Sequence, residues 1–173
     1  MSEIKKILFP VDLSESADEI ASCVIDFQKQ FQAELHLLFV ARVFGYFSTI
    51  YVDATMISTM EDAVIKGAQR SLQEFQDKYF SELPDIKARV LSGYASDEII
   101  KYCDDEEIDL VIMGTHGRSG LGKVVFGSVA EQVLRTSRVP VTVVNPFRKH
   151  HEEQRVLDRK TRSERSIRNG SLP

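Results

Sequence analysis

The chain has 173 residues, of which 43% are hydrophobic and 28% charged, a balance that predicts one globular domain with its own core. No apolar run is long enough to cross a bilayer, and the first residues lack the apolar stretch of a signal peptide. We therefore expect a cytoplasmic protein with no membrane role.

The net charge of −4 is unevenly divided along the chain. Residues 148–173 contain eight Lys and Arg against four Asp and Glu, a charge of +4, which leaves −8 for residues 1–147. An acidic body argues against nucleic-acid binding, which needs a basic surface. Because residues 148–173 contain few strongly apolar side chains, we expect a disordered or loosely helical tail after a folded domain that spans 1–147.

Strand-like and helix-like segments alternate through residues 1–147. The first strand is almost continuously apolar, which is typical of a strand buried on both faces of a parallel sheet. Ser16–Glu19 has the spacing of a capping box and should begin the first helix. Residues 42–58 show no clear pattern. In chain order, the expected strands are 4–11, 35–40, 86–91, 110–113 and 139–144, and the expected helices are 16–31, 60–80, 96–106 and one that begins near 128.

This alternation of five strands with four helices predicts an α/β fold with a doubly wound parallel sheet and right-handed crossovers. In open sheets of this kind, ligands bind beyond the carboxyl ends of the strands, where the direction of winding reverses. The short links after the first and fourth strands are therefore the expected ligand site.

The fourth helix is expected to offer an anion site at its N-terminus. Free N–H groups and the helix dipole attract anions there, whereas a carboxylate in the first turn repels them. This helix begins Gly127-Ser128-Val129-Ala130, with no acid before Glu131, and Arg118 and Lys123 precede it. The other three helices are expected to begin with acidic pairs, at Asp18–Glu19, Glu61–Asp62 and Asp97–Glu98.

The loop before this helix is rich in glycine. Glycines at 114, 117, 120, 122 and 127 should let the backbone turn with positive φ and approach a ligand closely, and Ser128 adds a hydroxyl donor. Two blander interpretations remain: the loop is simply flexible, or the missing acid is chance. Residues 117–124 nearly match a P-loop, but Val124 stands where magnesium requires Ser or Thr.

Read whole, the loop has the spacing Gly-x2-Gly-x9-Gly-Ser, which resembles the ATP-binding signature of the universal stress protein family. Four further segments resemble the first strand with its terminal aspartate, the second strand, the glycine turn into the third helix and the last strand of that family. They are Lys6–Asp12, Leu35–Val40, Gly93–Ile99 and Val139–Val144, so the resemblance covers about residues 3–146.

The resemblance implies an open five-stranded sheet of order 3-2-1-4-5 with helices on both faces, a Rossmann-like fold similar to the adenine nucleotide α-hydrolases. It also implies ATP as ligand, with any Mg²⁺ carried by the phosphates, and a homodimer through the edge strand Val139–Val144. Asp12 would lie against the adenosine, and the Val40 backbone would meet adenine. The full implied set is Pro10, Val11, Asp12, Val40, Met113, Gly114, His116, Gly117, Arg118, Gly127, Ser128 and Val129.

Several residues in or near this site allow a second interpretation. His116 has no nucleophile with a partner acid beside it, so loop hydrogen bonding is favoured over catalysis. Asp12 could act as a general base, but orientation of a ligand is favoured. Arg118 could contact phosphate or be a solvated loop cation. Outside the site, Cys23 and Cys103 are expected to be structural thiols, and His36 to pack in or beside the core.

Three functions remain in competition. The favoured one is an ATP-binding stress-response or regulatory protein with little or no hydrolysis. The second is an enzyme that adenylates a substrate or cleaves ATP between its α and β phosphates, although the stretch Val11–Ser16 lacks the glycines such enzymes carry after their first strand. The third is a scaffold whose basic tail binds a partner or an anionic surface.

Overall fold

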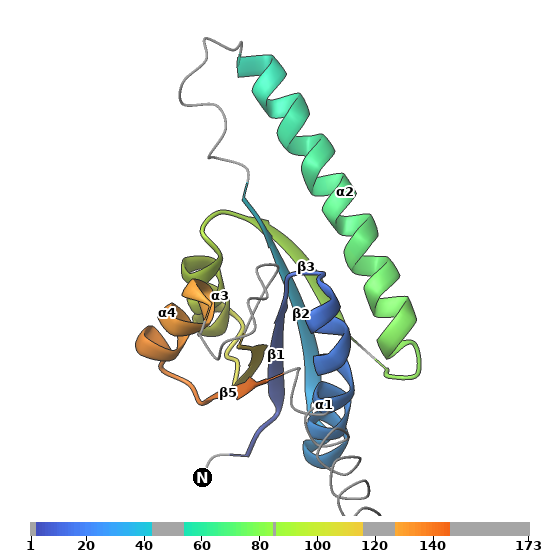
Figure 1. Cartoon of the computed structure of the whole chain (residues 1–173), viewed down its shortest axis with the longest axis vertical. Helices are drawn as coiled ribbons and strands as arrows, with labels where there is room; N and C mark the ends of the chain where they lie inside the picture. Colours follow the sequence, from blue (N-terminus) through green and yellow to red (C-terminus); the bar gives the residue numbers. More distant parts are fainter. Residues whose placement is uncertain (1–2, 43–53, 85, 116–126, 146–173) are drawn as a thin grey trace, which may run out of the picture.

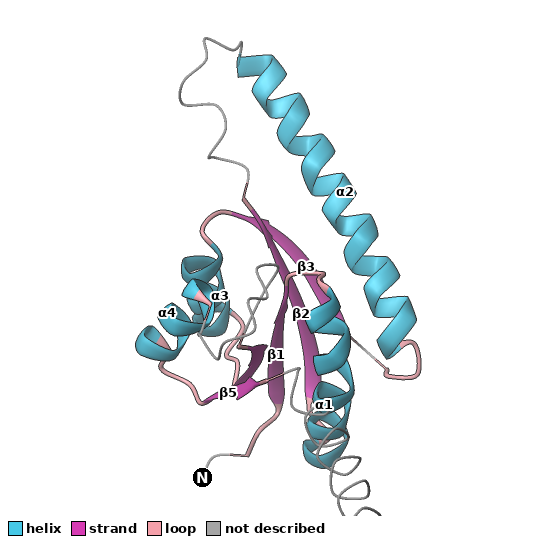
Figure 2. Cartoon of the chain, in the orientation of Figure 1, coloured by secondary structure: helices cyan, strands magenta, loops and turns pink. Residues whose placement is uncertain are grey.

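The computed structural model describes residues 3–42, 54–84, 86–115 and 127–145, and every structural statement below concerns these residues. They form a sheet with helices on both faces (Figures 1 and 2). The tail 148–173, for which disorder was expected, lies outside them. The elements are β1 (Lys6–Val11), α1 (Glu15–Phe31), β2 (Glu34–Ala41), α2 (Ala54–Phe80), β3 (Lys87–Ser92), α3 (Ala95–Asp105), β4 (Leu110–Gly114), α4 (Ser128–Thr136) and β5 (Val141–Val144).

The sheet has the order β3-β2-β1-β4-β5, and all four strand pairs are parallel. This confirms the predicted fold and strand order. The direction of winding reverses between β1 and β4, because β2 and β3 lie on one side of β1, while β4 and β5 lie on the other.

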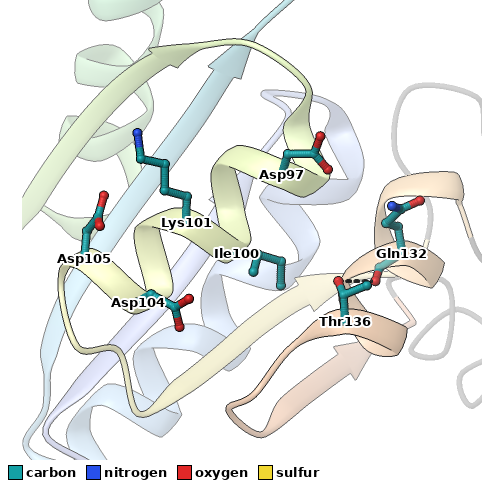
Figure 3. Close-up of a pocket in the computed structure, with 7 residues that line it drawn as sticks. All are labelled: Asp97, Ile100, Lys101, Asp104, Asp105, Gln132 and Thr136. Carbon is teal, nitrogen blue, oxygen red and sulfur yellow. Dashed lines mark hydrogen bonds between the residues drawn. The ribbon is translucent and has the colours of Figure 1, made fainter.

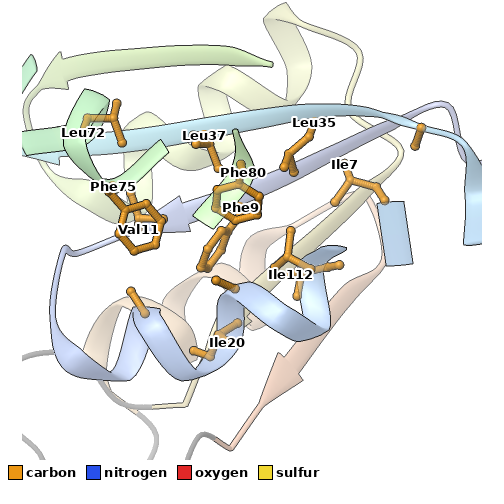
Figure 4. Packing of buried hydrophobic residues seen from close by; sticks show 14 of the residues in the cluster. Ile7, Phe9, Val11, Ile20, Leu35, Leu37, Leu72, Phe75, Phe80 and Ile112 are labelled. Atoms are coloured by element: carbon orange, nitrogen blue, oxygen red, sulfur yellow. The ribbon is translucent and has the colours of Figure 1, made fainter. Parts of the chain in front are cut away.

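Alternate residues of the central strands pack on opposite faces of the sheet. In β1, Ile7, Phe9 and Val11 join the core under α1 and α2, whereas Leu8 joins the core under α3 and α4. Figure 4 shows the first of these cores, with Phe9 at its centre. Burial on both faces explains why the strands read as continuous apolar runs rather than as alternating patterns.

The second helix is longer than predicted. The sequence pattern predicts a start at Met60, but α2 begins at Ala54 and spans 27 residues. At 1.5 Å per residue it is about 40 Å long, whereas the eight residues of β2 span about 26 Å. The N-terminal part of α2 therefore extends beyond the carboxyl ends of the strands (Figure 1), and Met60 and Val64 there are 46% and 48% exposed.

Three other local predictions are wrong. The N-cap of α1 is Ser14 and not Ser16, so the predicted capping box does not begin this helix. For α4, the sequence pattern predicts that Val129, Val133 and Leu134 face inward; Val133 is buried, but Leu134 is 40% exposed and Ala130 is buried in its place. The last strand begins at Val141 rather than Val139 because Ser137 and Val139 form a turn in which the Ser137 hydroxyl donates to the Val139 carbonyl at 2.8 Å.

His36 lies in the core, as expected, near the amino ends of the strands. Its ring is fully buried, with Nδ1 3.0 Å from the Tyr102 hydroxyl and Nε2 3.6 Å from Glu34 Oε1. Lys87 pairs with Glu34 at 3.0 Å and with Glu106 at 3.7 Å, which closes an ion-pair cluster over the histidine. Burial lowers the pKa of His36, although the Glu34 carboxylate opposes this shift. Burial also raises the pKa of Tyr102 to about 12, so its hydroxyl stays protonated.

This arrangement predicts a loss of stability in mild acid. Below the ordinary His pKa of 6.5, His36 is protonated in the unfolded chain but is still neutral in the folded chain. The free energy of unfolding therefore falls as the pH drops through that value. Of the charged groups around the ring, Glu34 and Glu106 raise the pKa of His36, and Lys87 and Lys6 lower it, but burial is the largest cause of the shift. We expect the melting temperature of His36→Asn to change less than that of the wild type between about pH 7.5 and 5.5. Equal pH dependence in thermal melts of both proteins would contradict this assignment.

Candidate functional site

Three predicted site residues lie at or next to the carboxyl ends of adjacent strands. Val11 pairs with Phe39, so Asp12 and Val40 are the next residues along β1 and β2. Gly114 ends β4, on the other side of β1, and pairs with Val144 of β5. The central position of β1 therefore brings residues from both halves of the sheet to one edge.

The pairing between β1 and β4 is short. It consists of Ile7 with Leu110 and Leu8 with Val111, although β1 continues to Val11 and β4 to Gly114. Among the described residues, the carboxyl-terminal parts of β1 and β4 are therefore not paired with each other. This is the switch point where ligands bind in sheets of this type.

Asp12 is held in a tight turn directly after β1. Its Oδ1 accepts hydrogen bonds from the Ser14 hydroxyl at 2.7 Å and from the Ser14 N–H at 3.2 Å, the pattern of an Asx turn. Between them, Leu13 adopts φ of 56°, a left-handed conformation that costs a side-chain-bearing residue about 1–2 kcal/mol. The two hydrogen bonds from Ser14 fix the direction of the half-buried Asp12 carboxylate.

The N-terminus of α4 is tied to the end of β4. The Gly127 N–H donates to the Thr115 carbonyl at 2.8 Å, and the Thr115 N–H donates to the Val144 carbonyl at 3.0 Å. Residues 115 and 127 are thus in direct contact, although eleven residues separate them in the chain. The bond places the first amides of α4 next to the strand ends that carry Asp12 and Gly114.

The remaining predicted site residues fall into three groups. Val11 and Met113 are each 5% exposed and pack in the two cores, so a ligand could meet only their backbone. Pro10 and Val129 are half-buried, and Ser128, the first residue of α4, is exposed. The other three, His116, Gly117 and Arg118, lie outside the described residues, and their roles stay predictions.

The prediction that Gly114 and Gly127 adopt positive φ is wrong. Gly127 has φ of −62° and ψ of 149°, an ordinary extended conformation, and Gly93 is the single described glycine with positive φ. The backbone conformation at positions 114 and 127 therefore does not require glycine. What glycine still provides at these positions is an open approach to the backbone.

The predicted contrast between helix N-termini is also wrong. Because α2 begins at Ala54, its first turn contains no acid, and Glu61 and Asp62 lie farther along the helix. The first turn of α4 does contain an acid, Glu131, which faces Arg135 at 4.0 Å. Position rather than charge distinguishes α4: its N-terminus meets the strand ends, whereas that of α2 projects away from the sheet (Figure 1).

A groove of about 430 Å³ between α3 and α4 is separate from this site. Its walls carry three carboxylates against one lysine (Figure 3), so it would repel a phosphate. It contains none of the predicted site residues. The groove is lined by Asp97, Ile100, Lys101, Asp104, Asp105, Gln132 and Thr136.

Sequence reasoning missed two residues that organise the site. Ser14 orients Asp12, and the spacing Asp-x-Ser after a strand is the signal that could have revealed it. Thr115 is 6% exposed and joins the ends of β4, β5 and α4 through its backbone, which no local pattern indicates.

Neither a metal centre nor a membrane helix emerges from the described ranges. They contain no cluster of three or more His, Cys, Asp or Glu able to hold a metal ion. None of the helices in these ranges is both long enough and apolar enough to cross a bilayer.

Comparison with known proteins identifies relatives over most of the chain. Residues 3–145 match the universal stress protein family. Universal stress protein MJ0531 of Methanocaldococcus jannaschii is 28% identical over 150 residues, 84% of each chain. Universal stress protein MJ0577 of the same organism is 32% identical over 152 residues, 81% of this chain and 94% of the other.

Solved structures show the same fold. A structure of MJ0577 superposes with a TM-score of 0.69 at 27% identity and covers 83% of this chain and 97% of its own. The universal stress protein of Archaeoglobus fulgidus, solved in complex with dAMP, superposes with a TM-score of 0.60 at 16% identity, covering 83% of this chain and all of its own. The sequence match, the strand order and the structural likeness agree, and the chain belongs to the universal stress protein family.

Proposed function

We propose that this protein binds ATP at the carboxyl edge of the sheet and acts in the cytoplasm as a stress-response or regulatory protein with little or no hydrolysis. The observation that carries the proposal is the 2.8 Å hydrogen bond from the Gly127 N–H to the Thr115 carbonyl. It brings a helix N-terminus, with its free amides and positive dipole end, to the switch point of the sheet.

The two ends of this edge suit the two ends of a nucleotide. At the α4 end, the N-cap residue Gly127 has no side chain with which to cap the first amides of the helix, so the N–H groups of Ser128 and Val129 can donate to phosphate oxygens. At the β1–β2 end, the fixed Asp12 carboxylate and the Val40 backbone would meet the ribose and adenine. A protein of this fold has been solved with dAMP, so the fold is compatible with an adenine nucleotide.

A binding role for Asp12 is favoured over catalysis. Its Oδ1 already accepts two hydrogen bonds from Ser14, which hold the carboxylate in place. A fixed, hydrogen-bonded carboxylate suits ligand orientation better than proton abstraction. Any Mg²⁺ would arrive with the phosphates. The competing proposal, an enzyme that adenylates a substrate or cleaves ATP, predicts turnover with release of pyrophosphate.

Isothermal titration of the full chain with ATP tests the proposal. We expect saturable binding at one site per chain, and mass spectrometry of the purified protein should identify adenine nucleotide carried from the cell. Absence of binding at millimolar ATP would overturn the proposal. Release of pyrophosphate at a steady rate would favour the enzyme instead.

We further propose that the protein forms a homodimer through β5. This strand pairs with β4 on one side, and its other edge has no partner among the described residues. The carbonyls of Pro140 and Val144 accept from β4, so by strand alternation the N–H and C=O of Val143 point outward. An exposed strand edge of this kind is usually covered, and a second copy would cover it.

Val143→Pro tests this dimer because it removes an outward N–H without removing a donor to β4. We expect light scattering after gel filtration to show the dimer dissociation constant raised by more than about tenfold, since two intermolecular hydrogen bonds are lost by symmetry. Val143→Ala shortens the same side chain but keeps the N–H, and should remain dimeric. A Val143→Pro protein as dimeric as wild type would exclude this edge.

A further inference from the structure

An exposed aromatic ring stands beside the end of β2. Tyr94 is 65% exposed, the largest value among the exposed large hydrophobic residues that the structure describes. The guanidinium carbon of Arg42 lies 5.8 Å from the centroid of its ring, within the range of a cation–π contact. The structure thus presents a paired aromatic ring and cation on its surface.

The backbone that carries this ring is held from both sides. The Gly93 N–H donates to the Ala41 carbonyl at 3.0 Å, which ties the β3–α3 turn to the end of β2. The Tyr94 carbonyl accepts from the N–H groups of Asp97 and Glu98, both at 3.0 Å. Gly93 has φ of 154°, and a Cβ there would lie 2.7 Å from the Glu98 carboxylate, so the turn is closely packed. The ring is exposed, but its attachment point is fixed.

Structural roles do not account for the tyrosine side chain. Tyr94 is the N-cap residue of α3, yet its side chain makes no capping hydrogen bond. It belongs to neither hydrophobic core. Tyrosine is enriched where a protein surface meets a partner, because its ring is apolar while its hydroxyl can stay in contact with water.

The ring also lies near the adenine end of the proposed site. Val40, whose backbone would meet adenine, pairs with Leu91, and Ala41 pairs with Ser92. Arg42 is two residues beyond Val40, and Tyr94 is two residues beyond Ser92. Both side chains therefore follow the strand ends next to the proposed base position.

We propose that Tyr94 and Arg42 form the outer wall of the adenine end, with the tyrosine ring stacking on the base and Arg42 holding the ring in place. This inference rests on the proposed ATP site and adds a base-recognition element to it. Tyr94 and Arg42 lie near the ends of β3 and β2, whereas the α4 amides proposed to bind phosphate lie near the end of β4. Stacking on Tyr94 should therefore affect binding of the base and not of the phosphates. The wall therefore distinguishes a nucleotide from a bare polyphosphate.

Titration of the full chain with ATP and with inorganic tripolyphosphate tests this wall. The Tyr94→Ala variant loses one base–aromatic contact, so its affinity for ATP should be about tenfold lower than that of wild type. Its affinity for tripolyphosphate should be unchanged. Tyr94→Phe keeps the ring and should bind ATP as wild type does. Arg42→Gln, which removes the cation over the ring, should weaken ATP binding less than Tyr94→Ala does.

The outcomes separate this inference from the proposed function. If wild type binds ATP and Tyr94→Ala binds it equally well, the wall is excluded while the ATP site stands. If Tyr94→Ala loses ATP and tripolyphosphate affinity together, the base-stacking role is likewise overturned. If wild type binds no ATP, the proposed function itself fails. Because the side chain is exposed and caps nothing, thermal melts of the variants should match wild type.

Discussion

Gly127→Val combined with Ser128→Ala should abolish measurable ATP binding and leave the protein folded. The valine side chain would stand where phosphate approaches the first amides of α4, and the alanine removes the hydroxyl donor beside them. The fold should survive because Gly127 has φ of −62° and ψ of 149°, values that valine adopts readily. The Gly127 N–H bond to Thr115 is a backbone bond and is retained.

Calorimetry and thermal melts of the same samples check this result. Gly67→Val is the matched control, because an added Cβ at Gly67 meets no atom within 4 Å and the residue lies in α2, outside the site. We expect this control to bind ATP with wild-type affinity. A double variant that keeps wild-type affinity would show that phosphate does not approach the amides at Gly127.

Phe9→Ala should cause the largest loss of stability. Phe9 is 1% exposed, and its ring lies 6.3 Å from that of Phe75 and 6.4 Å from that of Phe80, both in α2. Truncation removes apolar burial and leaves a cavity between β1 and the anchored half of α2 (Figure 4), at a cost of about 3–5 kcal/mol. Melting should fall by roughly 10 °C for a domain of this size.

Urea unfolding measures the free-energy change directly. Phe31→Ala is the matched control: its half-buried ring lies near the end of α1 and pairs with Phe27 at 6.1 Å. We expect it to cost about 1 kcal/mol, because little apolar surface there is fully removed from water. Equal losses for the two variants would contradict the central role assigned to Phe9.

The sequence predicts the sheet well because β1, β2 and β4 are buried on both faces and therefore read as short continuous apolar runs. The start of α2 is harder to predict. Residues 54–59 precede the charged and apolar alternation that begins at Met60, and this end of the helix lies beyond the carboxyl ends of the strands (Figure 1). The prediction of a capping box at Ser16 is wrong because the tight turn at Asp12–Ser14 places the N-cap two residues earlier, at Ser14.

The neighbourhood of the site is predictable in part. Asp12, Val40 and Gly114 meet because parallel strands end at one edge, a consequence of fold alone. The bond between Thr115 and Gly127 joins backbone atoms across a loop, and a sequence carries no signal for such a contact. The φ value of Gly127 was predicted wrongly because glycine permits positive φ without requiring it.

The ion-pair cluster around His36 and the candidate ligand edge lie at opposite ends of the same strands. On β2, His36 and Val40 lie four residues and about 13 Å apart, beyond the distance at which substitutions usually couple. Substitutions in the ion-pair cluster and at the candidate ligand edge should therefore affect stability and ligand binding independently. A lineage adapting to a warmer or more acidic habitat can alter one set of positions while selection holds the other constant.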